Sequence, residues 1–235
     1  MIYLIGGVPG MRKSTVITPC ICSQKPMYRN STDLIRASTS QLYWFITKRD
    51  PREEKMPEIP ELRTGEDTPA WIGTIGLIRL LNNQKKDALI EGIAIPPTGV
   101  RSLELQDPNL KVRAAFVGYG KTVEFQVPEW TPELEKLIET AIGKEYLENF
   151  AKKHDWMYRD KDGKPSPYND SLEARRIEDA VEAVRRSGCE NFKYFDLIDY
   201  IPRERRGEDS AILRLEDHIN AAMDIRSFFL NKSLT

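Results

Sequence analysis

The stretch IYLIGGVPGMRKST, residues 2–15, decides the fold. It opens with a continuous apolar run of strand-forming residues that glycines end abruptly, which is typical of a fully buried strand in a parallel sheet. We expect a helix to begin near Lys13. Pro19 falls inside that helix, where a proline removes a backbone donor and clashes with the preceding turn. The helix should therefore be short or kinked.

Apolar runs and helical patterns alternate along the rest of the chain. The apolar runs predict strands at residues 25–29, 88–90, 112–117 and 192–198. The helical patterns predict helices at about residues 33–48, 70–83, 131–142, 172–186 and 211–229. Strands that alternate with helices predict an α/β fold with a doubly wound parallel sheet.

Length and composition limit the possible function classes. The 235 residues suit a single α/β domain, residues 1–235, and residues 49–69 hold four prolines among charges of both signs, which indicates a solvated insertion. The formal net charge of −1 provides no basic field that would attract nucleic acid or anionic lipid. Three cysteines and two histidines argue against a disulfide framework and a zinc site. No apolar run is long enough to span a membrane and no basic segment precedes the first strand, so we expect a cytoplasmic protein without a signal peptide.

Residues 7–14, GVPGMRKS, have the spacing of the phosphate-binding motif GxxxxGK[ST], with Arg12 at the second glycine position. Backbone N–H groups of the loop and of the helix start would face a β-phosphate. Lys13 would reach the β- and γ-phosphates, and the Ser14 hydroxyl would ligate Mg²⁺. The residues expected to bind ATP are Gly7, Val8, Pro9, Gly10, Met11, Arg12, Lys13, Ser14 and Thr15.

Arg12 is the departure from the motif. A glycine at this position lets the backbone approach phosphate closely and adopt unusual dihedral angles. An arginine leaves two outcomes open. In the first, its side chain would point outward and add positive charge near the phosphates. In the second, its Cβ would distort the loop and weaken phosphate binding.

Three motifs together, at residues 6–15, 31–36 and 89–92, resemble those of the P-loop small-molecule kinases. The 2-phosphoglycerate kinase-like proteins are most similar, and the zeta-toxin-type and polynucleotide kinases share the layout more loosely. The resemblance covers roughly residues 1–120 and is specific for the kinase class more than for its acceptor. It implies a P-loop NTPase fold of the nucleoside-monophosphate-kinase type, with three layers, a parallel five-stranded sheet and a helical or loop lid.

The same resemblance implies roles for individual residues. Asp33 would be the general base for the acceptor hydroxyl, and Arg36, one turn later, would grip an anionic acceptor. Glu91, at the end of an apolar strand, would hold Mg²⁺ together with Ser14, through water. The alternatives are that Asp33 only caps a helix, that Arg36 is a surface residue, and that Glu91 is a charge leaving the sheet.

The resemblance also implies a lid at about residues 155–176, in which Arg175 and Arg176 would cover the transferred group as catalytic cations. The alternative is that both arginines lie on a solvated helix face. The sequence therefore predicts ATP- and Mg²⁺-dependent phosphoryl transfer to a hydroxyl of a small metabolite. The expected role of Arg36 indicates that this metabolite is anionic. A second reading is a degenerate P-loop protein that binds nucleotide with weak or no turnover because of Arg12. A third, a nucleic-acid 5′-hydroxyl kinase, is disfavoured because it needs clustered Lys and Arg.

Overall fold

The computed structural model describes residues 1–38, 69–126, 128–144, 146 and 171–231. The predicted insertion, apart from Pro69, and residues 155–170 of the predicted lid lie outside these ranges. The chain divides into two compact units, which are described separately. The first comprises Met1–Gly7, Met27–Phe116 and Ala180–Lys193, and the second comprises Val8–Pro26, Val117–Asp179 and Tyr194–Thr235.

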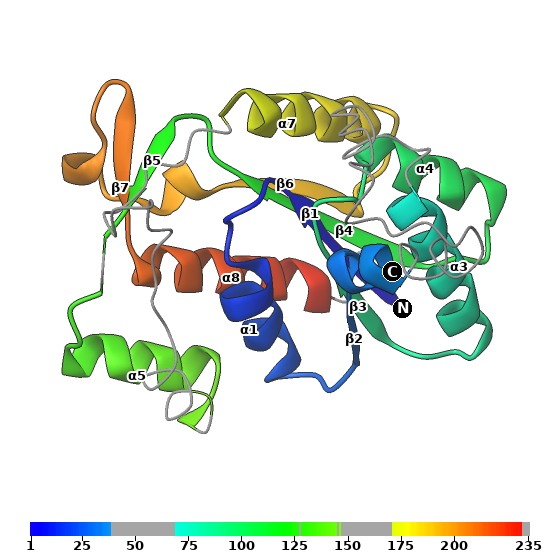
Figure 1. Ribbon diagram of the computed structural model, residues 1–235, viewed down its shortest axis with the longest axis horizontal. Helices are drawn as coiled ribbons and strands as arrows, with labels where there is room; N and C mark the ends of the chain where they lie inside the picture. The colour runs from blue at the N-terminus through cyan, green and yellow to red at the C-terminus, as the bar shows by residue number, and fades with distance from the viewer. Residues whose placement is uncertain (39–68, 127, 145, 147–170, 232–235) are drawn as a thin grey trace, which may run out of the picture. The chain divides into compact units, whose positions relative to one another are not determined.

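The central sheet has five strands in the order β2-β3-β1-β4-β6 (Figure 1). Their bounds are β1 Ile2–Gly7, β2 Tyr28–Ser31, β3 Ala88–Glu91, β4 Val112–Gly118 and β6 Phe192–Asp196. β3 pairs in parallel with both β1 and β2. Every residue of β1, β3 and β4 is buried, as expected for strands of a parallel sheet that is covered on both faces. The α/β fold with a five-stranded parallel sheet is thereby confirmed.

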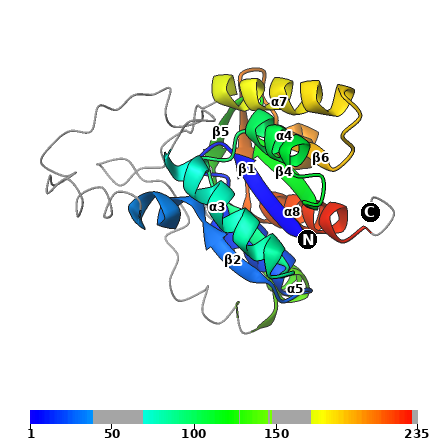
Figure 2. The ribbon, with the colours of Figure 1, turned by 90° about the vertical axis from the view of Figure 1, so that its right-hand side faces the viewer.

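Helices α3 (Pro69–Asn83) and α4 (Pro97–Gln106) belong to the first unit. α3 packs against β1, as Figure 2 shows, and its Trp71 is fully buried. A Cβ at Gly99 of α4 would lie 2.7 Å from Trp71 Nε1, so the glycine allows this close approach. No helix was predicted from the sequence at the position of α4. A proline in the first turn is nevertheless compatible with a helix start, because a backbone N–H at that position would have no partner within the helix.

The second unit contains α1 (Thr18–Cys22), α5 (Pro132–Ala141) and α8 (Leu215–Leu230), and α7 (Ser171–Arg186) begins in it. α5 starts as predicted, because the Thr131 hydroxyl accepts a hydrogen bond from the Leu134 amide at 3.2 Å. Ile138 and Ala141 are buried on the same helix face as Leu134. None of the helices among the described residues is long and apolar enough to cross a membrane.

A two-stranded parallel sheet in the second unit, β5 (Thr122–Phe125) with β7 (Ser210–Leu213), was not predicted. The prediction of a helix from residue 211 is wrong at its start, because α8 begins at Leu215. In β7, Ala211 and Leu213 are buried while Ile212 is exposed, which is the two-residue period of a strand. β2 begins at Tyr28, later than the predicted residue 25, and β6 ends at Asp196, where the 3₁₀ helix η3 (Leu197–Tyr200) follows.

Candidate functional site

The loop that follows β1 has left-handed backbone at several positions. Gly7 has φ 120° and Gly10 has φ 78°. Arg12 has φ 50° and ψ 30°, so it occupies the left-handed helical region although it carries a Cβ. Turns with left-handed residues direct successive N–H groups toward a common concave space that suits an anion. The loop therefore has backbone geometry of the kind that binds phosphate.

Lys13 lies directly after these residues and is buried, with 6% of its surface exposed. Its Nζ donates a hydrogen bond to the carbonyl oxygen of Val8, at 2.6 Å. This contact closes over the loop residues between them and keeps the ammonium group within the loop. Ser14, the next residue, is exposed.

The helix that follows the loop opens with a π turn, η1 (Lys13–Ile17), which continues as the five-residue α1. The amides of Val16 and Ile17 both donate to the Arg12 carbonyl, at 2.8 and 3.2 Å. Pro19 lies in the first turn of α1. The prediction of a short or kinked helix after the loop is confirmed, because α-helical bonding begins only at Thr18 and ends at Cys22.

The Arg12 side chain lies over an aromatic ring in its own unit. Its guanidinium carbon is 5.6 Å from the centroid of the Phe125 ring, and that ring stacks on His218 with centroids 5.8 Å apart. Burial and, to a smaller extent, the positive charge of Arg12 lower the pKa of His218 to about 4. The Cβ of Arg12 therefore does not keep the loop from the left-handed conformation, and the arginine has a packing partner that the sequence did not indicate.

In the first unit, Glu91 lies at the carboxyl end of β3 and is buried, with 6% of its surface exposed. It is in register with Ile5 of β1 on one side and Ser31 of β2 on the other. The carboxyl ends of three adjacent strands thus meet here, which is where ligands bind in parallel sheets. Gly92 follows with φ 153°, and a Cβ there would lie 1.8 Å from Thr32 Oγ1.

Asp33 and Arg36 lie on the helix that begins at residue 32. Arg36 Nη2 is 3.7 Å from Asp33 Oδ1, so the two residues share one helix face as predicted. The Asp33 side chain is 66% exposed and the Arg36 side chain is 61% exposed. The Ser31 hydroxyl accepts a hydrogen bond from the Asp33 amide at 3.2 Å. Ser31 therefore caps this helix in place of Asp33.

The two predicted lid arginines lie in the first turns of α7, in the second unit. Arg175 Nη2 donates to the carbonyl oxygen of Gly120 at 3.1 Å. Arg176 forms an ion pair with Glu173 at 3.6 Å and is largely exposed. Arg175 thus binds a backbone carbonyl and Arg176 a carboxylate, and the catalytic role of these arginines stays a prediction.

Asp196 is a buried carboxyl that the sequence analysis left without a role. It ends β6 and accepts the Ile198 amide at 2.9 Å, which caps η3. Desolvation raises its pKa, and the negative charge of Asp199 raises it further. The Tyr194 hydroxyl is buried without a hydrogen-bond partner among the described residues, and a Cβ at Gly118 would lie 2.3 Å from it. Asp196 stands at the end of an apolar strand, and this position was the sequence signal that could have identified it.

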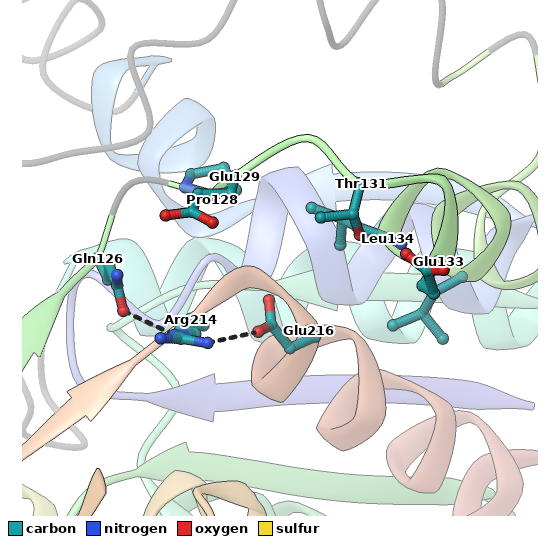
Figure 3. Close-up of a pocket in the computed structure, with 9 residues that line it drawn as sticks. Gln126, Pro128, Glu129, Thr131, Glu133, Leu134, Arg214 and Glu216 are labelled. Carbon is teal, nitrogen blue, oxygen red and sulfur yellow. Dashed lines mark hydrogen bonds and ion pairs between the residues drawn. The ribbon is translucent and has the colours of Figure 1, made fainter.

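A cavity of about 310 Å³ opens at the carboxyl ends of β5 and β7 (Figure 3). Figure 3 shows Arg214 between two of its partners: Nε donates to Gln126 Oε1 at 2.6 Å, and Nη1 is 3.8 Å from Glu216 Oε1. The remaining lining comes from the start of α5 and the residues before it, including Glu129 and Leu134. None of these residues was predicted from the sequence to line a cavity, since both strands were missed.

No protein-family model and no curated protein sequence matches this chain. Among solved structures, the chain is similar to a gluconokinase from Sinorhizobium meliloti 1021, with 10% identity, coverage of 97% of this chain and 91% of that chain, and a TM-score of 0.39. It is similar to a sugar kinase from Janibacter sp. HTCC2649, with 11% identity, coverage of 99% and 95%, and a TM-score of 0.39. It is also similar to a shikimate kinase from Bacteroides thetaiotaomicron, with 11% identity, coverage of 97% and 98%, and a TM-score of 0.35.

Proposed function

We propose that this chain is an ATP- and Mg²⁺-dependent kinase that phosphorylates a hydroxyl of a small anionic metabolite. The observation that carries the proposal is the conformation of the loop after β1. Left-handed Gly10 and Arg12 curve its backbone, and the Lys13 ammonium is held within it at the Val8 carbonyl. A buried strand, this loop and a helix that starts at the lysine are the three parts of a phosphate-binding site.

The loop residues bind the triphosphate in this proposal. Lys13 exchanges the Val8 carbonyl for phosphate oxygens, and the loop amides donate to the β-phosphate. Ser14 is an exposed residue and offers its hydroxyl to Mg²⁺, an ion that keeps several waters and needs few protein ligands. Bound Mg²⁺ neutralises developing charge on the phosphates, and Glu91 remains its second predicted ligand.

Asp33 and Arg36 serve the acceptor. Asp33 accepts the proton of the acceptor hydroxyl, whose oxygen forms a bond to the γ-phosphorus as the bond to ADP breaks. The ion pair between Asp33 and Arg36 is exposed and contributes at most about 1 kcal/mol, so Arg36 is available to bind an anionic group. Arg175 and Arg176 remain the proposed cations around the transferred phosphoryl group.

Calorimetric titration with Mg-ATP tests the nucleotide site directly. The parent chain should bind, and Lys13→Ala should lose most of the affinity while its thermal unfolding stays cooperative. Lys111→Ala, at an exposed lysine before β4, is the matched control and should bind as the parent does. Equal affinity of the parent and Lys13→Ala would refute the phosphate site. A metabolite-pool screen for ADP release, with Lys13→Ala as the blank, then identifies the acceptor.

The competing function is nucleotide binding without turnover, and the observation that favours it is the left-handed Arg12. A Cβ in this conformation costs about 1–2 kcal/mol relative to glycine, so the loop is less easily formed than one with the full motif. This alternative predicts that Arg12→Gly binds Mg-ATP much more tightly than the parent, and that no metabolite pool stimulates ADP release by the parent.

A further inference from the structure

The carbonyl of Thr15 is one residue past Ser14, at the start of the helix that follows the phosphate loop. In a regular helix it would accept the amide of residue 19, but residue 19 is a proline and has no N–H. The Tyr146 hydroxyl donates a hydrogen bond to this carbonyl. We propose that Tyr146 is a positioning residue for the phosphate loop, which it stabilises by replacing the amide that Pro19 lacks. This inference rests on the proposed function.

The helix start depends on such an outside donor because its own hydrogen bonding is irregular. Val16 and Ile17 both donate to the Arg12 carbonyl, so the turn is wider than an α turn. The ring of Pro19 is buried, and a proline ring disfavours close approach of the carbonyl four residues earlier, which is that of Thr15. The hydroxyl of Tyr146, on a separate segment, reaches this carbonyl, to which residue 19 can offer no amide.

Tyr146 comes from a segment that is itself anchored to α1. The Ala141 carbonyl, at the end of α5, accepts Ser23 Oγ at 3.0 Å and Arg226 Nη1 at 3.3 Å. Ser23 follows the last residue of α1, whereas Thr15 precedes its first residue. Ala141 and Tyr146 therefore contact the chain beyond the two ends of α1, and Ser23 and Tyr146 both line a cavity of about 460 Å³.

The peptide group that carries the Thr15 carbonyl also carries the Val16 N–H, which donates to the Arg12 carbonyl. Fixing that carbonyl restrains the turn that holds Ser14 and the loop amides in place. Preorganised donors bind an anion more tightly than donors that must first be ordered. Loss of the Tyr146 hydroxyl should therefore weaken Mg-ATP binding about three- to tenfold, the effect of one net hydrogen bond.

A cycle of Tyr146→Phe, Pro19→Ala and the double variant tests this role. Tyr146→Phe should raise the Kd and KM for Mg-ATP about three- to tenfold with little change in kcat. Pro19→Ala restores an amide at residue 19, so adding Tyr146→Phe to it should change the Kd less than about twofold. Tyr200→Phe is the matched control, since its hydroxyl also makes one hydrogen bond, to Asp224 at 3.0 Å, and it should leave the Kd unchanged.

Several results would overturn the inference while leaving the proposed function intact. One is an unchanged Kd in Tyr146→Phe when Lys13→Ala loses binding, and another is an equal effect of Tyr146→Phe with and without Pro19. If the parent chain binds no Mg-ATP, the proposed function fails. Hydrogen exchange of the Val16 and Ile17 amides then decides the structural role alone: faster exchange in Tyr146→Phe supports it, and unchanged exchange refutes it.

Discussion

The guanidinium of Arg12 lies over the ring of Phe125, 5.6 Å from its centroid. Arg12 is the residue that departs from the phosphate-loop motif, and its left-handed backbone costs about 1–2 kcal/mol relative to glycine. A cation–π contact contributes about 0.5–1 kcal/mol at exposed sites and about 2 when desolvated. Arg12 is half-buried, so the contact offsets much of the backbone cost.

This balance predicts that Arg12→Gly changes the free energy of unfolding by less than about 1 kcal/mol, because relief of the backbone and loss of the ring contact have opposite signs. A double-mutant cycle with Phe125→Leu, followed by urea denaturation, should give a coupling free energy of about 1 kcal/mol between the two side chains. Strict additivity would mean that the ring does not stabilise the arginine.

His218 predicts a pH dependence of stability in which acid is destabilising. Its pKa in the folded chain is about 4, against an ordinary value near 6.5, so below pH 6.5 the unfolded chain takes up a proton that the folded chain does not. The free energy of unfolding should fall as the pH is lowered from about 6.5 to 4, with a loss of several degrees in Tm.

The charges that face His218 are those of Arg12, which opposes protonation, and Asp217, which favours it. His218→Gln should flatten the Tm profile between pH 6.5 and 4, although it also costs stability through lost packing on Phe125. A profile as steep as that of the parent would assign the acid sensitivity to other groups.

Gly92 and Gly76 form a matched pair of glycine positions. Gly92→Ala should destabilise by more than about 1 kcal/mol, because φ is 153° and the new Cβ would lie 1.8 Å from Thr32 Oγ1. Gly76→Ala, inside α3 with open space around it, should stabilise by up to about 1 kcal/mol. Chemical denaturation of both variants measures the contrast, and equal effects would contradict it.

Asp33→Asn and Arg36→Gln should leave the free energy of unfolding within about 1 kcal/mol of the parent value, because the ion pair between them is exposed. With the acceptor identified, Asp33→Asn should lower kcat strongly and Arg36→Gln should raise the KM for the acceptor more than that for ATP. Full activity of Asp33→Asn would remove it from the catalytic role.

Elements with local signals were predicted from the sequence. α5 begins at a threonine cap followed by a proline, and both signals act within one turn. β5 and β7 were missed because each has only four residues and its pairing partner lies far away in the chain. Neither strand has a local pattern strong enough to be distinguished from a loop or a helix end.

The sequence by itself determined where the glycine-rich loop after β1 lies and that the following helix is short or kinked, since glycine and proline act on the backbone dihedral angles beside them. It left open how Arg12 is accommodated. Only the tertiary structure decided that its side chain lies over Phe125 and that the Tyr146 hydroxyl donates to the Thr15 carbonyl. Both partners come from segments distant in the chain, and such contacts depend on packing in space, which no local pattern of residues encodes.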